Sequence, residues 1–316
     1  MPSISSDSSV NELDLPEVEV LLATLNGERY LSEFLESLAQ QQGVKIHLRV
    51  SDDGSTDKSL EIVESYSSKF ASIRTLIGPQ KGPSANFFFL MKHSHYDFVA
   101  IADQDDIWLP SHLIHSLKRL SLSADPLAMT FCQVAETSNP SSSEFRIWPK
   151  VTSPLELFGS FFENYARGCT IVMKKELVKL ITDNSTDGAV MHDWWIYLVA
   201  KSCGSAIFSE TCEITYRIHS ENTIGRGPRI QSRLFSIFKT IRSNQWAPWK
   251  QLVQINQIFN QRMSVEAKNE ISILIRLVDL SFSSKISALF FSNRRFRKNL
   301  VSDFLVKTYL LIQTIP

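Results

Sequence analysis

Residues 18–57 read VEVLLATLNGERYLSEFLESLAQQQGVKIHLRVSDDGSTD, and they contain the unit from which the rest of the fold is built. The run at 18–25 is almost wholly apolar, which predicts a strand covered on both faces. Apolar residues then recur at helical spacing over 30–38, and a second β-rich run follows at 46–51. This order predicts two strands of a mostly parallel sheet that are joined by a helix.

The same alternation continues along the chain. It predicts further helices at 57–69, 84–93, 110–120 and 194–200, and further strands at 73–77, 98–102, 170–173 and 213–218. The sequence therefore predicts an α/β domain. In open sheets of this kind ligands bind beyond the carboxyl ends of the strands, so polar residues at those points are expected to face a crevice.

Composition excludes several classes of protein. The 316 residues are 43% hydrophobic and 21% charged, which excludes a disordered or fibrous chain. The 33 basic and 33 acidic side chains balance, which argues against a dedicated nucleic-acid binder. Four scattered cysteines form no Cys-x-x-Cys pair, so we expect reduced thiols. Charges interrupt every apolar stretch that approaches the ~20 residues of a membrane span. We expect a cytoplasmic protein, with peripheral contact to the inner face of the cell membrane left open.

Three segments are expected: a disordered lead-in at 1–15, the α/β domain at 16–225, and a helical, basic extension at 226–316. All charged residues from 222 to 265 are basic, and they are interspersed with Phe235, Phe238, Trp246 and Trp249. A further basic run follows at 294–298. This pattern is typical of amphipathic helices on anionic lipid. The alternative, helices that pack on the α/β domain or on a second subunit, stays open.

Two acidic segments follow predicted strands. SDDGSTD at 51–57 contains turn and helix-capping residues, but these roles do not explain the adjacent carboxylates of Asp52 and Asp53. ADQDDIW at 102–108 places three carboxylates within four residues. Mg²⁺ and Mn²⁺ prefer oxygen ligands, and Mg²⁺ is often held by one or two carboxylates together with substrate phosphates. Two acidic strand ends in one domain indicate a metal–nucleotide site.

Five motifs carry a family resemblance: ATLNGE at 23–28, the two acidic segments, HDWW at 192–195 and YRIH at 216–219. From 18 to 225 the chain resembles an inverting family-two glycosyltransferase of the GT-A fold, in particular the bacterial rhamnosyltransferase-like branch. The resemblance implies a Rossmann-like nucleotide-diphospho-sugar transferase domain with a C-terminal helical extension. It implies transfer of a sugar, with rhamnose as the first candidate, from a dTDP- or UDP-linked donor. The implied acceptor is a cell-surface polysaccharide or a lipid-linked oligosaccharide.

The resemblance also implies roles for single residues. Asp193 would be the catalytic base, since an inverting transfer needs one carboxylate to take the proton of the acceptor hydroxyl. Asp53 would accept a hydrogen bond from a pyrimidine imide, because an ionised carboxylate only accepts. The implied nucleotide-binding residues are Ala23, Thr24, Asn26, Glu28, Asp52, Asp53, Asn86 and Asp103. The implied ligands of Mg²⁺ or Mn²⁺ are Asp103, Asp105 and His219. The implied residues on the acceptor or diphosphate side are Gly168, Trp194, Trp195 and Arg217.

The chain departs from the family at two points. Leu25 stands where many relatives have an aromatic residue, and Ala85 stands where relatives often have a basic residue before Asn86. Lys81 is one candidate for the missing phosphate contact. The tryptophans can instead be core residues of a helix, and His219 a surface residue. A metal-dependent phosphohydrolase and a non-catalytic GT-A scaffold stay as alternative functions, and the oligomeric state is open.

Overall fold

A computed structural model describes residues 15–140, 144–148, 156–219, 247–292 and 294–312. Almost all of the expected lead-in at 1–15 lies outside these ranges. So does the expected boundary between 225 and 226, together with Phe235, Phe238 and Trp246.

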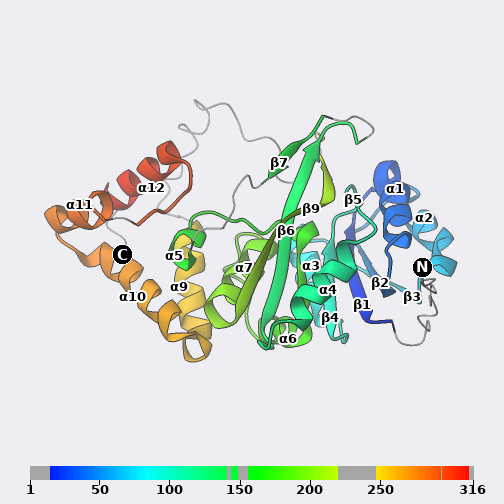
Figure 1. The fold of residues 1–316 in the computed structure, drawn as a ribbon, viewed down its shortest axis with the longest axis horizontal. Helices are drawn as coiled ribbons and strands as arrows, with labels where there is room; N and C mark the ends of the chain where they lie inside the picture. The colour runs from blue at the N-terminus through cyan, green and yellow to red at the C-terminus, as the bar shows by residue number, and fades with distance from the viewer. Residues whose placement is uncertain (1–14, 141–143, 149–155, 220–246, 293, 313–316) are drawn as a thin grey trace, which may run out of the picture.

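One mixed sheet forms the centre of the molecule (Figure 1). Within the described residues its strands are β1 (Glu17–Thr24), β2 (Lys45–Asp52), β3 (Ser72–Ile77), β4 (Phe98–Ala102), β5 (Ile107–Trp108), β6 (Ala128–Thr137), β7 (Arg146–Trp148), β8 (Val172–Lys174) and β9 (Ser205–Arg217). The order is β3-β2-β1-β4-β8-β6-β9-β5, with β7 paired to β6. The first four strands are parallel to one another. The short strand β8 runs antiparallel to both β4 and β6, whereas β6 and β9 are parallel. The expectation of a mostly parallel sheet therefore holds for the first half, and the second half is mixed.

Helices cover both faces of the sheet. Those of the α/β part are α1 (Glu28–Ala39), α2 (Ser59–Ser65), α3 (Pro83–Lys92), α4 (His112–Ser121), α5 (Leu157–Ser160), α6 (Lys175–Thr182) and α7 (His192–Cys203). Strand β1 shows why both faces are needed. Leu21 packs in one core with α3, α6 and α7, whereas Val20 and Leu22 pack in a second core with α1, α2 and α4. Successive side chains of a strand point to opposite faces, and this confirms that the run at 18–25 is covered twice.

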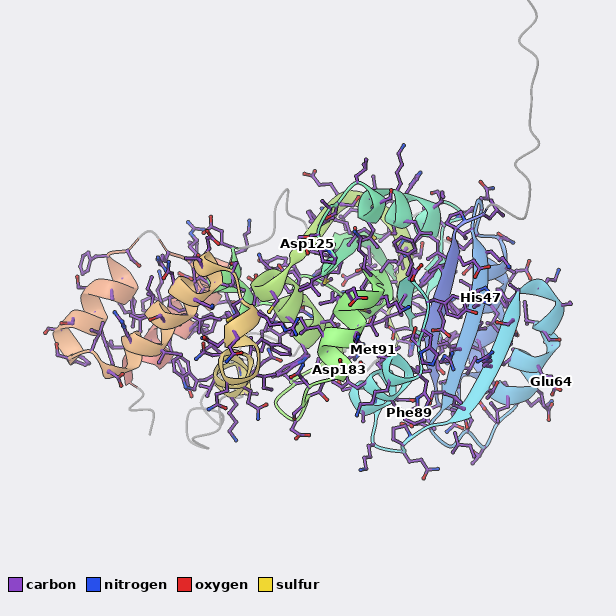
Figure 2. The ribbon with its side chains drawn as sticks, turned by 90° about the horizontal axis from the view of Figure 1, so that it is seen from below. His47, Glu64, Phe89, Met91, Asp125 and Asp183 are labelled. Carbon is purple, nitrogen blue, oxygen red and sulfur yellow. The ribbon has the colours of Figure 1, made fainter. Side chains whose placement is uncertain are left out.

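The C-terminal region is helical and extends the first core. It contains α9 (Ala247–Phe259), α10 (Val265–Asp279), α11 (Phe282–Phe290) and α12 (Leu300–Ile312). The Ser264 and Ser281 hydroxyls cap α10 and α11 by accepting backbone N–H bonds. Figures 1 and 2 place α10–α12 at the end of the molecule away from β1–β3. Trp249 is buried, so it packs inside the protein, whereas the basic and aromatic composition of its segment was typical of a helix that faces lipid. Among the described helices none has the length and apolarity to cross a membrane.

Two neighbouring residues of α10 test whether this region folds with the α/β domain. Leu274 is fully buried in the shared core, whereas Ile273 is 39% exposed. We expect Leu274→Ala to lower the free energy of unfolding by about 2–5 kcal/mol, because it leaves a cavity. Ile273→Ala is the matched control and should cost less than about 1 kcal/mol. Urea unfolding followed by tryptophan fluorescence measures both. A separate early transition in Leu274→Ala, with the main transition unchanged, would contradict a shared core.

Candidate active site

A cavity of about 670 Å³ opens beyond the carboxyl ends of β1, β2 and β4. These strands are parallel neighbours, so the residues that follow them meet at one edge of the sheet. The segment before α7 and the end of β9 form the opposite wall. The predicted site residues that line this cavity are Ala23, Thr24, Asn26, Asp53, Asn86, Asp103, Asp105, Gly168, Asp193 and His219.

The loops after β1 and β2 are joined to each other by hydrogen bonds. The Asn26 backbone N–H donates to Ser55 Oγ (2.8 Å), and Thr56 N–H donates to Asn26 Oδ1 (2.9 Å). Asn26 has a left-handed φ of 48°, which asparagine tolerates better than most residues. The SDDGSTD segment therefore holds the loop that follows β1.

The two adjacent aspartates of this segment have different roles. Asp52 is buried and accepts the backbone N–H groups of Gly54 and Ser55, so it stabilises the turn. Asp53 lines the cavity, and its carboxylate is oriented by the N–H groups of Gln80 (2.9 Å) and Gly82 (3.2 Å). Asp52 was predicted to contact a nucleotide, as was Glu28, but the structure brings neither residue into the cavity wall. The Glu28 carboxylate accepts from the Lys58 N–H.

Asn86 lies at the cavity but is almost fully buried. Its Nδ2 donates to the Ser51 carbonyl (3.0 Å) and so joins α3 to the end of β2, while Oδ1 has no partner in the described structure. Lys81, one candidate for a phosphate contact, is exposed and is not part of the cavity wall.

Carboxylates crowd together after β4. Burial, followed by the charges of Asp105 and Asp193, raises the pKa of Asp103 to about 7. Burial and the charges of Asp105 and Asp103 also raise the pKa of Asp106, and its Oδ2 has no partner in the described structure. Asp105 Oδ2 lies 2.6 Å from His219 Nε2. This set of repelling oxygens beside an imidazole suits a hard divalent cation.

Two groups of side chains among the described residues bring potential metal-ligand atoms close together. Asp103, Asp106 and Cys169 each bring one potential ligand atom within 4.8 Å of the others, but a thiol is a poor ligand for Mg²⁺ or Mn²⁺. His112, Cys132 and Glu213 form a second such group. There Arg119 Nη2 donates to Glu213 Oε2 (3.0 Å), so a cationic side chain already compensates this buried carboxylate.

Asp193 lies in the first turn of α7, across the cavity from the strand ends. It is 6% exposed, and its Oδ1 accepts the Trp194 N–H at 2.6 Å. Burial raises the pKa of Asp193 to about 6, although the Trp194 and Gly168 amides and the Arg167 charge lower it. The group is therefore ionised at neutral pH and more basic than an ordinary aspartate, as a general base should be.

Gly168 allows this corner of the cavity to close. A Cβ at this position would lie 2.9 Å from His192 Nε2 and 3.8 Å from the Asp193 Cβ. His192 is buried and its ring is tilted against that of Phe87, with the centroids 4.2 Å apart, and burial lowers its pKa to about 3. A neutral imidazole thus fills the space that a side chain at 168 would need.

Three further predicted residues lie elsewhere. Trp195 was predicted to contact an acceptor, but the structure buries it fully, packs it edge-on against Phe259 and does not place it in the cavity wall. Trp194 does not line the cavity either, and its Nε1 donates to the Ser160 carbonyl (2.8 Å). Arg217 lies behind the acidic edge, where its Nε donates to the Asp105 carbonyl (3.0 Å).

A fixed arginine in the cavity wall was not predicted. The Arg167 guanidinium lies between two aromatic rings, 4.3 Å from the centroid of Trp148 and 4.0 Å from that of Tyr216. Its Nη2 also pairs with Glu136. All three partners come from different strands, and Trp148, Arg167 and Tyr216 line the cavity. The one available signal was the position of Arg167 directly before the Gly168 motif.

Comparisons with known proteins show the family and the fold of the chain. The model of the family "Glycosyl transferase family 2" matches residues 19–170. The dTDP-rhamnosyl transferase RfbG of Shigella flexneri is 30% identical over 217 residues, which cover 65% of this chain and 73% of that protein.

Two solved structures show the same fold. Staphylococcus aureus TarS 1–349 in complex with UDP superposes with a TM-score of 0.52 at 17% identity, covering 86% of this chain and 75% of that one. Mannosyltransferase PcManGT from Pyrobaculum calidifontis, in complex with GDP-Man and Mn²⁺, gives 0.53 at 14% identity, covering 95% and 87%. These likenesses confirm the predicted GT-A fold with its helical C-terminal region.

The contact between Gly168 and His192 can be tested by a double-mutant cycle. Gly168→Ala should lower the free energy of unfolding by about 1–3 kcal/mol, because the new methyl group overlaps the imidazole. His192→Ala removes that overlap, so the double variant should be more stable than the sum of the two single effects by about 0.5–3 kcal/mol. Urea denaturation gives all four values. Strict additivity would mean that the two residues do not meet as described.

Proposed function

Because the chain belongs to glycosyl transferase family 2, we propose that this cavity binds a pyrimidine nucleoside diphosphate sugar and transfers the sugar with inversion. The chain is a glycosyltransferase that uses nucleotide sugars and a homologue of a rhamnosyltransferase. The observation that carries the proposal is the convergence of Asp53, the Asp103–Asp105 pair and Asp193 on one cavity from opposite walls.

The proposed donor is dTDP-rhamnose, with a UDP-linked sugar as its closest competitor. Two observations support a pyrimidine base. Asp53 presents an oriented acceptor to the cavity, which suits the imide N–H that thymine and uracil share. The relative RfbG is named as a dTDP-rhamnosyl transferase. Leu25 also lines the cavity, so this edge offers the base an aliphatic contact.

A divalent cation, Mg²⁺ or Mn²⁺, is proposed at the acidic edge. Asp105, Asp103 and His219 would hold it, and the mutual repulsion of these carboxylates supports the assignment. When bound, such an ion neutralises charge on a diphosphate leaving group. The charge of Arg167 acts on both Asp103 and Asp193. Trp148, Tyr216 and Glu136 hold its guanidinium in place.

Asp193 is proposed as the base. It would accept the acceptor hydroxyl's proton as that oxygen forms a bond to C1 of the sugar, while the bond from C1 to the diphosphate oxygen breaks. No covalent sugar–enzyme bond is needed. The proposal is supported by placement, since Asp53, Asp103 and Asp105 follow strands whereas Asp193 faces them from α7.

The proposed acceptor is a cell-surface glycan or a lipid-linked oligosaccharide. Trp148 and Tyr216 line the cavity and supply the apolar surface that a sugar ring packs on. We assign this wall to the acceptor in place of Trp194 and Trp195. The phosphohydrolase alternative loses support, because the chain belongs to glycosyl transferase family 2. His192 lines the cavity beside Asp193, but burial lowers its pKa to about 3 and its ring packs on Phe87.

We expect Asp193→Asn to lower the rate of transfer by about 10²–10⁴-fold, because the amide cannot accept the proton. In the wild type, transfer should rise with pH through about 6 and then level off, since only the ionised carboxylate is a base. Initial rates with dTDP-rhamnose across pH 5–9 measure both effects.

Two checks make this assignment specific. Arg167→Met removes a charge that lowers the pKa of Asp193, so the pH midpoint should move upward, and Arg167→Lys should move it less. Donor binding by Asp193→Asn, measured by calorimetry, should stay near that of the wild type. Undiminished transfer by Asp193→Asn would refute the assignment of the base.

Removal of metal should abolish transfer, and Mn²⁺ or Mg²⁺ should restore it. Asp105→Asn should weaken Mn²⁺ binding at least about tenfold, because it removes a charged ligand. Asp183→Asn is the control: this carboxylate, labelled in Figure 2, is exposed after α6 and does not line the cavity. Electron paramagnetic resonance of free Mn²⁺ gives the affinities. Full activity in chelator, or equal Mn²⁺ affinity in Asp105→Asn and Asp183→Asn, would contradict this metal site.

A further inference from the structure

The helices α11 and α12 meet at one end. Phe290, the last residue of α11, and Phe304, in the second turn of α12, place their ring centroids 5.8 Å apart. The contact brings the residue that follows α11 close to the first turns of α12, whereas Phe296, between them in the sequence, is buried in the core. We call this region the α11–α12 tip and define it by Phe291, Arg294, Arg295, Leu300, Val301 and Phe304. Figures 1 and 2 place both helices at the end of the molecule away from β1–β3.

The tip is unusually apolar for an exposed surface. Phe291 is 82% exposed, Leu300 65%, Val301 64% and Phe304 58%. Eight of the fourteen large apolar side chains that are exposed among the described residues lie between Val265 and Phe304. Single exposed apolar residues are ordinary, but a cluster marks an interaction surface.

The tip is also basic. Arg294 and Arg295 are exposed beside Phe291 in the sequence. From 280 to 312 the chain has six basic residues and one acidic residue, Asp303. Asp303 is buried and is already paired with Lys307 at 3.0 Å, and it also accepts the N–H groups of Phe296 and Arg297. Its charge is therefore compensated inside the fold. The exposed charges of the tip are those of Arg294 and Arg295, and the Arg294 guanidinium also lies 5.1 Å from the centroid of the Phe158 ring.

We propose that the α11–α12 tip docks on an anionic lipid bilayer. Apolar side chains beside arginines match the acyl boundary and the phosphate headgroups of such a surface. A second copy of the chain fits less well. In a two-fold dimer the same patch would face its copy, so the arginines of both chains would be brought into one interface that has no exposed acidic residue of the tip to pair with them. The helices have nine and thirteen residues, shorter than the ~20 of a span, so the contact is shallow.

Docking deepens the proposed function through the lipid-linked acceptor, but vesicle binding is measured without donor or transfer. The two can therefore fail separately: an enzyme that transfers sugar but ignores vesicles would overturn only the docking surface.

The test is flotation of the full chain with vesicles. We expect binding to vesicles that contain phosphatidylglycerol, release at high salt, and little binding to phosphatidylcholine alone. The pair Phe291→Ser and Val301→Ser should reduce binding about tenfold or more, since both side chains are exposed and would be buried in lipid. Arg295→Glu should reduce binding to anionic vesicles by a similar factor and make it less sensitive to salt.

Matched controls keep the result specific. Leu122→Ser removes an equally exposed apolar side chain (81%) from the end of α4, and Arg74→Glu reverses an exposed charge on β3. Both should bind as the wild type does. Wild-type protein that stays unbound at low salt, or tip variants that bind normally, would overturn the proposal. A dimer in sedimentation that Phe291→Ser dissociates would assign the surface to a second copy and overturn it too.

Discussion

Mutual repulsion among carboxylates at the edge of the sheet is the constraint on which the site depends. Asp103, Asp105 and Asp106 follow one strand, and burial together with their charges raises the pKa of Asp103 and of Asp106. Such an arrangement destabilises the fold unless a cation joins it. It persists because the strand that carries it is held in a core: β4 pairs with β1 and β8, and its residues Val99, Ala100 and Ile101 are fully buried. The stability of the sheet thus offsets the repulsion among the carboxylates of the site.

The opposite wall holds Asp193. This carboxylate lines the cavity although it is nearly buried, and its pKa is raised. The backbone N–H of Trp194, in the first turn of α7, donates to Asp193. Because Gly168 has no side chain, the neutral His192 ring can occupy the space beside it. Arg167 limits the rise in the pKa of Asp193, and it is fixed by Trp148, Tyr216 and Glu136 rather than by its own segment. The basicity of Asp193 is therefore a property of the packing between β6, β7, β9 and α7.

The sequence predicted those elements whose signals lie in neighbouring residues. The strands at 18–25, 46–51, 73–77 and 98–102 and the acidic segments after two of them were predictable, because periodicity and turn residues are local signals. β6 was not predicted, although it forms the longest pairing of the sheet with β9. The polar residues Thr130, Gln133 and Glu136 interrupt its apolar run, and their burial arises from contacts with distant segments. The different roles of Asp52 and Asp53 were not predicted, although adjacent side chains of an extended chain point in opposite directions. The roles of Trp195 and Arg167 arise from contacts between distant segments, and spacing does not encode these.

One continuous core joins the site to the C-terminal end. Trp195 on α7, Leu274 on α10, Leu289 on α11 and Val306 on α12 belong to the same buried cluster. Protein interiors are packed densely enough to transmit position, so the α11–α12 tip is not a loosely tethered anchor. Its orientation is coupled, through α10, to the helix whose first turn carries Asp193. A surface that docks on lipid through the tip would therefore hold the cavity at a fixed angle to the bilayer. This coupling explains how helices remote from the chemistry would select an acceptor presented at the membrane.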